Sequence, residues 1–92
     1  MLARRYVVAG RVQGVGFRWF VDHEARQLGV NGWVRNSIDG SVEVFAQGTE
    51  QQLNALGRKL QEGPRAARVD RLKEIDAEVQ PELKTFRIEG AW

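Results

Sequence analysis

The chain of 92 residues contains no cysteine, a single histidine and two prolines. The lack of cysteine excludes disulfides, thiolate metal sites and a cysteine nucleophile. The histidine, His23, argues against a histidine-based metal site, and its place on the polar side of a predicted helix indicates an exposed residue without catalytic duty. No apolar run reaches 18 residues, and the one near the N-terminus is broken by Gly10 and Arg11. Neither a signal peptide nor a membrane span is predicted, so we expect a cytoplasmic protein.

The chain is also low in net charge, at +2, which by itself is too little to indicate a nucleic-acid-binding protein. Its length predicts one domain over residues 1–92, and 42% hydrophobic with 28% charged residues is typical of a globular protein. The charge is uneven: residues 1–35 hold six arginines and two acids, whereas residues 36–92 hold eight bases and ten acids. The basic part is also rich in glycine, which hints at an anionic ligand, although a chance spread of surface charge explains it equally well.

Apolar spacing and turn signals divide the chain into two helices and five strands. A helix is predicted over 17–28 because its apolar residues recur on one face and Gly29 follows. A second helix is predicted after the capping-box pair Thr49 and Gln52 and before Gly63-Pro64. The Asp39-Gly40 pair predicts a hairpin. The predicted strands are 4–12, 30–36, 41–47, 67–75 and 84–90.

This β-α-β-β-α-β order predicts an α+β fold, the ferredoxin-like sandwich, with an antiparallel sheet and both helices on one face. Right-handed crossovers place strand 4–12 beside strand 41–47 in the middle of the sheet. The loop before the first helix then lies at one end of the central strands.

That loop carries the sequence QGVGFR, residues 13–18, between a strand and the start of a helix. The first amides of a helix have no partner within the helix and favour a negative charge, and glycines let a preceding loop curl its amides around one point. Arg18 adds a planar fork that matches phosphate oxygens. The stretch lacks the Lys-Ser/Thr of a Walker loop and the glycine spacing of a Rossmann fingerprint. Phosphate binding, a plain tight connection and another role therefore all stay open.

Two segments, GRVQGVGFR (10–18) and GWVRNSIDGSVEV (32–44), resemble the acylphosphatase family. The resemblance implies a metal-free hydrolase that cleaves the carboxyl–phosphate bond of acyl phosphates and needs no cofactor. It implies that Arg18 binds the phosphoryl group and that Asn36 positions the attacking water. It also implies that loop amides hold the phosphate oxygens, those of Gln13, Gly14, Val15, Gly16, Phe17 and Arg18.

The expected partners follow from this resemblance. The substrate is a small acyl phosphate, with inorganic phosphate or sulfate as a competing ligand, and no residue specifies a pocket for the acyl part. We expect a monomer that binds neither nucleic acid nor membrane.

Other interpretations of the same residues stay open. Asn36 suits a hairpin turn, and Arg18 suits a solvated helix surface. Trp19 is either a wall of the site or an ordinary exposed aromatic, and Trp33 is expected in the core. RNA-recognition modules share the β-α-β-β-α-β order, but their aromatic motif belongs on the third strand, where this chain offers only Phe45. A non-catalytic domain of the same family, or one inside a larger maturation enzyme, is the remaining alternative.

Overall fold

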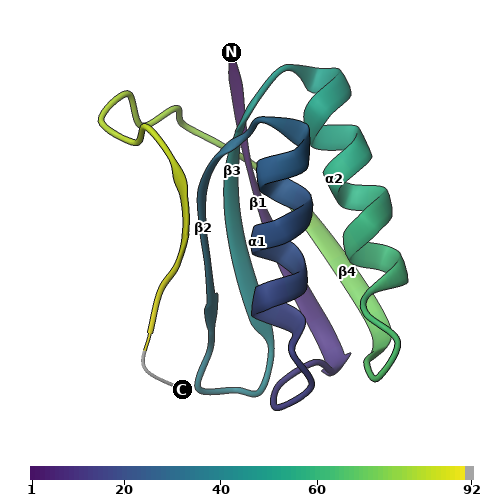
Figure 1. Cartoon of the computed structure of the whole chain (residues 1–92). Coiled ribbons are helices and arrows are strands. Elements are labelled where there is room, and N and C mark those ends of the chain that lie inside the picture. Colours follow the sequence, from purple (N-terminus) through teal and green to yellow (C-terminus); the bar gives the residue numbers. More distant parts are fainter. Residues whose placement is uncertain (91–92) are drawn as a thin grey trace.

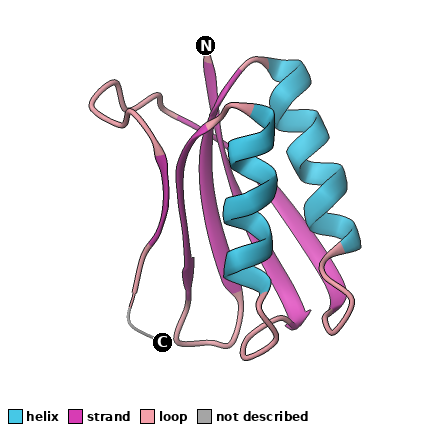
Figure 2. Ribbon diagram, in the orientation of Figure 1, coloured by secondary structure: helices cyan, strands magenta, loops and turns pink. Residues whose placement is uncertain are grey.

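The computed structural model describes residues 1–90, in which two helices pack side by side on one face of a five-stranded sheet (Figure 1). The predicted order of helices and strands is confirmed, and Figure 2 shows the two layers. The elements are β1 (Leu2–Arg11), α1 (Phe17–Leu28), β2 (Asn31–Asn36), β3 (Val42–Gly48), α2 (Glu50–Glu62), β4 (Arg68–Ala77) and β5 (Phe86–Ile88).

The strands lie in the order β4-β1-β3-β2-β5, so β1 and β3 are adjacent in the middle, as predicted. The first four strands pair antiparallel, but β5 pairs parallel to β2, which makes the sheet mixed rather than wholly antiparallel. The cause is the connection over 78–85, which crosses from one edge of the sheet to the other at a single end (Figure 1). Strand β5 must then run in the direction of β2.

Both helices begin and end where their capping residues stand. The Thr49 side chain accepts the Gln52 amide hydrogen at 3.1 Å, and the Gln52 side chain accepts that of Thr49 at 2.8 Å, which confirms the predicted capping box. Gly29 follows the last residue of helix α1. Its left-handed conformation lets its backbone amide donate to the carbonyl oxygens of Ala25 and Arg26 in the last turn. These local signals were sufficient to place the helices because each cap is made within a few residues.

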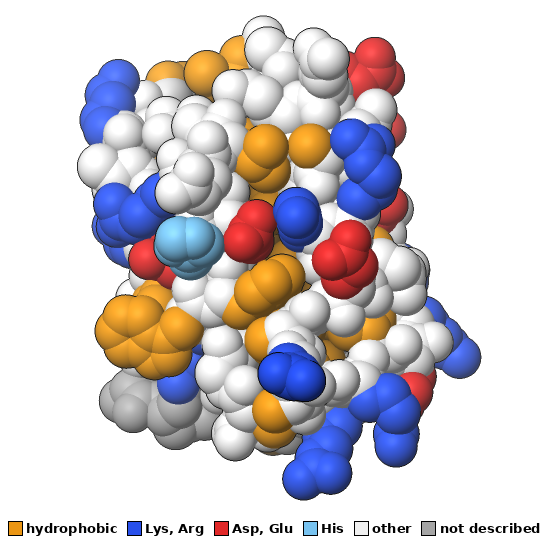
Figure 3. All heavy atoms as spheres, turned by 45° about the vertical axis from the view of Figure 1, so that its right-hand side comes forward, with side chains coloured by type: hydrophobic (Ala, Val, Ile, Leu, Met, Phe, Trp, Pro, Cys, Tyr) orange, Lys and Arg blue, Asp and Glu red, His pale blue; other side chains and the backbone are white. Residues whose placement is uncertain are grey.

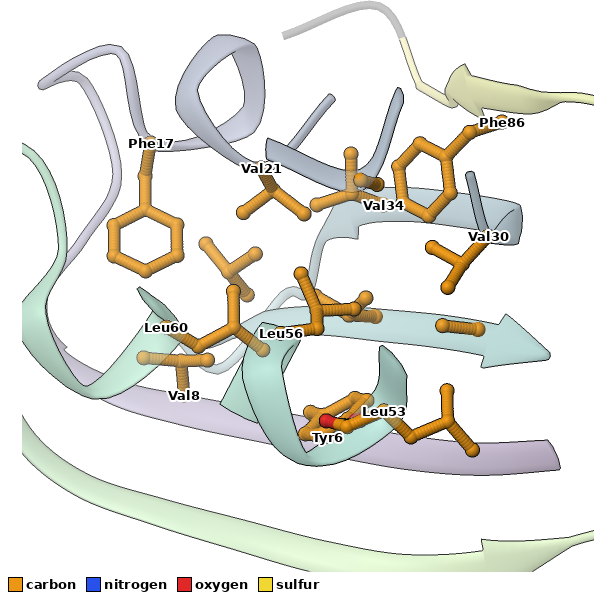
Figure 4. Packing of buried hydrophobic residues seen from close by; sticks show 14 of the residues in the cluster. Tyr6, Val8, Phe17, Val21, Val30, Val34, Leu53, Leu56, Leu60 and Phe86 are labelled. Atoms are coloured by element: carbon orange, nitrogen blue, oxygen red, sulfur yellow. The ribbon is translucent and has the colours of Figure 1, made fainter. Parts of the chain in front are cut away.

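The core lies between the helices and the sheet (Figure 4). Its members alternate along the strands and follow one face of each helix, as expected for amphipathic elements. At its centre is Tyr6 of β1, which is fully buried and donates its hydroxyl hydrogen to the carbonyl of Leu53 in α2 at 2.7 Å. Burial raises the pKa of Tyr6 to about 12, since the phenolate would lose its hydration there.

We expect the free energy of unfolding to fall as pH rises from about 10 to about 12. The unfolded chain ionises its tyrosine near pH 10 whereas the folded chain holds the proton to about 12, so two pKa units correspond to about 2–3 kcal/mol. Tyr6→Phe should lose about 1 kcal/mol at neutral pH and show no such alkaline decline. Chemical unfolding across this pH range measures both effects.

Tyr6 is the only tyrosine of the chain, so its ultraviolet absorbance reports its ionisation directly. Titration of that band near pH 10 in the folded protein would contradict the effect of burial.

Strand β3 is buried on both faces, although its sequence alternates as if one face were open. On the face opposite the helices, Glu43 accepts hydrogen bonds from Arg5 and Arg35 of the two neighbouring strands. Burial raises the pKa of Glu43, but these hydrogen bonds and charges outweigh it and hold the pKa below its usual value. Trp33 stacks on Phe45 on this same face, with its ring 4.6 Å from the Arg35 guanidinium carbon. The prediction that Trp33 belongs to the core between the helices and the sheet was therefore wrong. Val34, the next residue of the strand, is in that core, and successive side chains of a strand point to opposite faces.

Candidate active site

One pocket, with a volume of about 170 Å³, lies where β1 passes into α1 and β2 turns into β3. Both connections are at the same end of the sheet (Figure 1). The pocket brings together Arg18, from the first turn of α1, and Asn36, the last residue of β2. These two side chains are 18 positions apart in sequence, yet both border the same hollow. The lining residues are Val12, Gly14, Gly16, Phe17, Arg18, Trp19 and Asn36.

The loop that forms one side of the pocket alternates in backbone handedness. Gly14 and Gly16 have φ of 73° and 78°, while the other residues between 12 and 17 keep negative φ. Alternation of this kind turns successive amide hydrogens toward a common concave side, which is the geometry of an anion-binding nest. A Cβ at either glycine would meet open space, so glycine serves the backbone conformation there rather than close packing.

The start of α1 borders the same pocket, and the first amides of a helix have no partner within the helix. Gly16 is the residue that caps the helix, and no side chain accepts a hydrogen bond from the first turn in the part of the chain that the structure describes. The first turn also contains no acidic residue. Within residues 1–90, no capping side chain and no acid of the first turn neutralises the partial positive charge of the helix start, which therefore favours an anionic ligand.

Arg18 is held by the segment that follows the edge strand β5. Its Nη1 donates to the carbonyl oxygen of Glu89 at 3.3 Å, and the Glu89 amide donates to Val34 at 2.8 Å. The segment that follows β5 is thus fixed on β2 and in turn fixes the guanidinium. A guanidinium has five N–H donors, so the Arg18 side chain still has donors for an anion in the pocket while Nη1 is bonded to Glu89.

Asn36 is held by the β2–β3 hairpin, in which it stands opposite Val42. The turn is closed by Asp39, whose carboxylate accepts the amide hydrogen of Ser41 at 3.0 Å and its hydroxyl hydrogen at 2.6 Å. These two hydrogen bonds lower the pKa of Asp39. The Asp39-Gly40 pair therefore has the turn role predicted for it, and the hairpin presents Asn36 at the pocket from a rigid support.

The sequence model of the acylphosphatase family matches residues 4–88 of this chain. The chain belongs to the acylphosphatase family. An acylphosphatase of Koribacter versatilis is 61% identical over 89 residues, which cover 97% of this chain and 81% of the relative. The crystal structure of acylphosphatase from Bacillus subtilis superposes with a TM-score of 0.93 at 37% identity, and the match covers 98% of this chain and all of that one. These matches confirm the ferredoxin-like α+β fold and show a hydrolase that acts on acyl phosphates.

The acylphosphatase fold is also part of a longer protein. Full-length HypF, crystallised in a phosphate- and nucleotide-bound form, matches with a TM-score of 0.86 and 32% identity. The match covers 97% of this chain but 12% of HypF. The same unit thus serves both as a protein of about this length and as a segment of a larger one.

The acylphosphatase pocket is lined by most, but not all, of the residues predicted for it. Gly14, Gly16, Phe17, Arg18 and Asn36 line it. Two other side chains of the predicted loop do not border the pocket: Gln13 bonds to the β2–β3 hairpin, and Val15 packs against the core. Sequence reasoning missed Val12 and left Trp19 undecided, and Trp19 lines the pocket while 72% exposed. The sequence signal for Trp19 was its position off the apolar face of α1, where an aromatic side chain is not needed for the core.

Cationic side chains gather at the same end of this acylphosphatase. Figure 3, seen over the helices, shows a group of them toward its lower right. Arg11 ends β1 beside Arg68 of β4, and Arg65 lies in the turn before that strand. All three are exposed, and Arg68 forms an ion pair with Asp70. A cationic surface beside the pocket favours the approach of an anionic substrate.

Features of other functional classes are not found within residues 1–90. No cluster of three His, Cys, Asp or Glu side chains in that range could hold a metal ion. None of the helices formed by these residues is long and apolar enough to span a membrane. The aromatic residues of the GVGFRWF segment lie on α1 or at its start rather than on the sheet, and Phe45 of β3 is 2% exposed. The stacking surface that an RNA-recognition module needs is therefore lacking at that position.

Proposed function

We propose that this chain hydrolyses small acyl phosphates to a carboxylate and inorganic phosphate with no metal ion or cofactor, through Arg18 and Asn36. The observation that carries this proposal is the pocket in which those two side chains meet the start of α1. It supplies two elements that the reaction needs, a cradle for a dianion and a polar group beside it.

The cradle would hold the phosphoryl group. Amides of residues 13–18 and the Arg18 guanidinium would donate to the oxygens on which charge is spread during phosphoryl transfer. Because they are fixed before the substrate arrives, they need no reorganisation during the reaction. Arg18 lies in the first turn of α1, where a cation is unfavourable without a counter-charge, and a bound phosphate would supply that charge.

Asn36 would orient the attacking water. Its side-chain carbonyl accepts a hydrogen bond from water while its NH₂ donates one, so it can direct a lone pair at phosphorus. An amide is not a base, and we infer that the phosphate itself takes the proton. The water oxygen forms the new bond to phosphorus, the bond to the acyl oxygen breaks, and the carboxylate leaves with that electron pair. A carboxylate is a good leaving group, so no general acid is needed.

Several finer points belong to the same proposal. Inorganic phosphate or sulfate competes with the substrate for the cradle, and the acyl part is recognised broadly. The chain works as a single-domain monomer in the cytoplasm and takes neither nucleic acid nor membrane as a partner. The main alternative is a non-catalytic domain of the same fold that binds phosphate only.

We expect the purified chain to hydrolyse benzoyl phosphate at the same rate with and without EDTA, and inorganic phosphate to inhibit competitively. Release of phosphate, measured against the spontaneous hydrolysis of the same solution, provides the rate. Activity that disappears with EDTA and returns with a divalent cation would contradict the metal-free mechanism. Phosphate binding without any hydrolysis would favour the non-catalytic alternative.

A further inference from the structure

Gln13 links the two halves of the site without bordering the pocket. Its Nε2 donates to the carbonyl oxygens of Ser37 at 2.8 Å and Ser41 at 2.9 Å. Gln13 belongs to the cradle loop, whereas both serines belong to the turn that follows Asn36. The residues joined are 24 and 28 positions apart in sequence. The partly buried Gln13 side chain is therefore a direct connection from the loop to the hairpin.

The two carbonyls it contacts are those that close the turn. The Ser37 amide donates to Ser41 at 2.9 Å, and the Gly40 amide donates to Ser37 at 3.1 Å. Gln13 thus adds a second donor to each of the two carbonyl oxygens that define the turn. Asn36 is the residue immediately before Ser37, at the start of this turn. A displacement of the hairpin by about 1 Å away from the loop would stretch these hydrogen bonds beyond the usual range of about 2.7–3.2 Å.

The chemistry of the contact requires the amide of glutamine. Two carbonyl oxygens can be satisfied together only by a group with two hydrogens to donate, and a side-chain NH₂ is such a group. A glutamate of the same size would set a carboxylate against both carbonyls. The family resemblance assigned Gln13 only an amide of its backbone for phosphate; the side chain has separate partners.

We propose that Gln13 is a positioning residue, whose side chain sets the place of Asn36 relative to the phosphate cradle. This inference rests on the proposed function of Asn36. Turnover depends on a water aligned with phosphorus, and a misplacement of about 1 Å in such a geometry costs about 10²-fold in rate. Phosphate binding depends on the loop amides and on Arg18. Within residues 1–90 the Gln13 side chain donates to the Ser37 and Ser41 carbonyls, whereas Arg18 donates to the Glu89 carbonyl.

The test is Gln13→Met, which keeps the length of the side chain and removes both donors. We expect kcat for benzoyl phosphate to fall about 10- to 100-fold, with the inhibition constant of inorganic phosphate within about threefold of its original value. In a chain that already carries Asn36→Ala, the same substitution should change kcat less than about twofold, since the residue through which it acts is gone.

Gln47→Met is the matched control. Gln47 makes the same kind of link, from its Nε2 to the carbonyl of Gln80 at 2.9 Å, at the other end of the sheet. Because the Gln47 side chain also accepts the Gln80 amide hydrogen, its replacement should lower the free energy of unfolding at least as much, while leaving kcat unchanged. If kcat fell only because the fold was destabilised, it would fall in both variants. If it fell because Asn36 was displaced, it would fall in Gln13→Met alone.

Three results would overturn the proposal: an unchanged kcat in folded Gln13→Met, a phosphate constant that worsens in step with kcat, or a full further loss in the Asn36→Ala background. If Gln13→Met does not fold, Gln13→Asn is judged by the same criteria, and failure of both to fold would make Gln13 a requirement of the fold instead. If the unaltered chain hydrolyses no acyl phosphate, the proposed function fails before this comparison begins.

Discussion

Replacing Asn36 with alanine should abolish most of the turnover of benzoyl phosphate while leaving phosphate binding intact. Loss of one preorganised polar group at a reaction centre costs about 3–4 kcal/mol, so kcat should fall about 10²- to 10³-fold. The cradle is built from the loop before α1 and from Arg18, and Asn36 borders it from β2. Steady-state kinetics, with inorganic phosphate as the competitive inhibitor, separate the two effects.

Asn31→Ala is the matched control for this change. Asn31 begins the strand that Asn36 ends, and its side chain donates to the Leu83 carbonyl at 3.3 Å, away from the pocket. Its loss should affect stability but not kcat. An Asn36→Ala enzyme that turns over at the parental rate, or one that loses phosphate affinity and kcat together, would contradict the role in orienting water.

Arg18→Gln should lose both substrate binding and turnover. The guanidinium would contact the phosphoryl group before and during the reaction, so KM should rise and kcat should fall, with kcat/KM reduced by about 10³-fold or more. Arg18→Lys keeps the charge but not the planar fork, and we expect it to recover only part of the loss. Steady-state kinetics with benzoyl phosphate measure the loss of turnover, and calorimetric titration with inorganic phosphate measures the loss of phosphate binding.

Arg26→Gln tests whether the loss comes from the chemistry or from the fold. Arg26 lies two turns further along α1 and, like Arg18, donates to a backbone carbonyl of the C-terminal segment, that of Phe86, at 2.7 Å. Its replacement should weaken the docking of β5 without a comparable loss of kcat/KM. Hydrolysis by Arg18→Gln at the parental rate would show that the role assigned to Arg18 is wrong.

The parts of the fold that could be predicted are those encoded within a few residues. The capping box at Thr49 and Gln52, the αL residue Gly29 and the Asp39-Gly40 turn are each complete in short stretches of chain. The pairing of β5 with β2 could not be predicted in the same way. Alternation around Phe86 shows that a strand exists, but says nothing of the edge of the sheet to which it binds.

Some features of the candidate site could likewise be predicted from short stretches of sequence, whereas others depend on remote segments. Gly14 and Gly16 beside a helix start already predict a curled, amide-lined loop, and the family motifs supply Arg18 and Asn36. The supports of these residues come from remote segments, since the acceptor of Arg18 is 71 positions away and the partners of Gln13 are at least 24 away. Burial of Glu43 was also not evident, because arginines from two other strands cover it.

The anchoring of Arg18 on Glu89 has a consequence for biosynthesis. The ribosome adds the arginine 71 residues before the residue whose carbonyl oxygen holds it. Strand β5 can dock on β2 only after its own residues have been made and have left the exit tunnel. A nascent polypeptide therefore carries an unfinished phosphate site until β5 and the residue that follows it have docked.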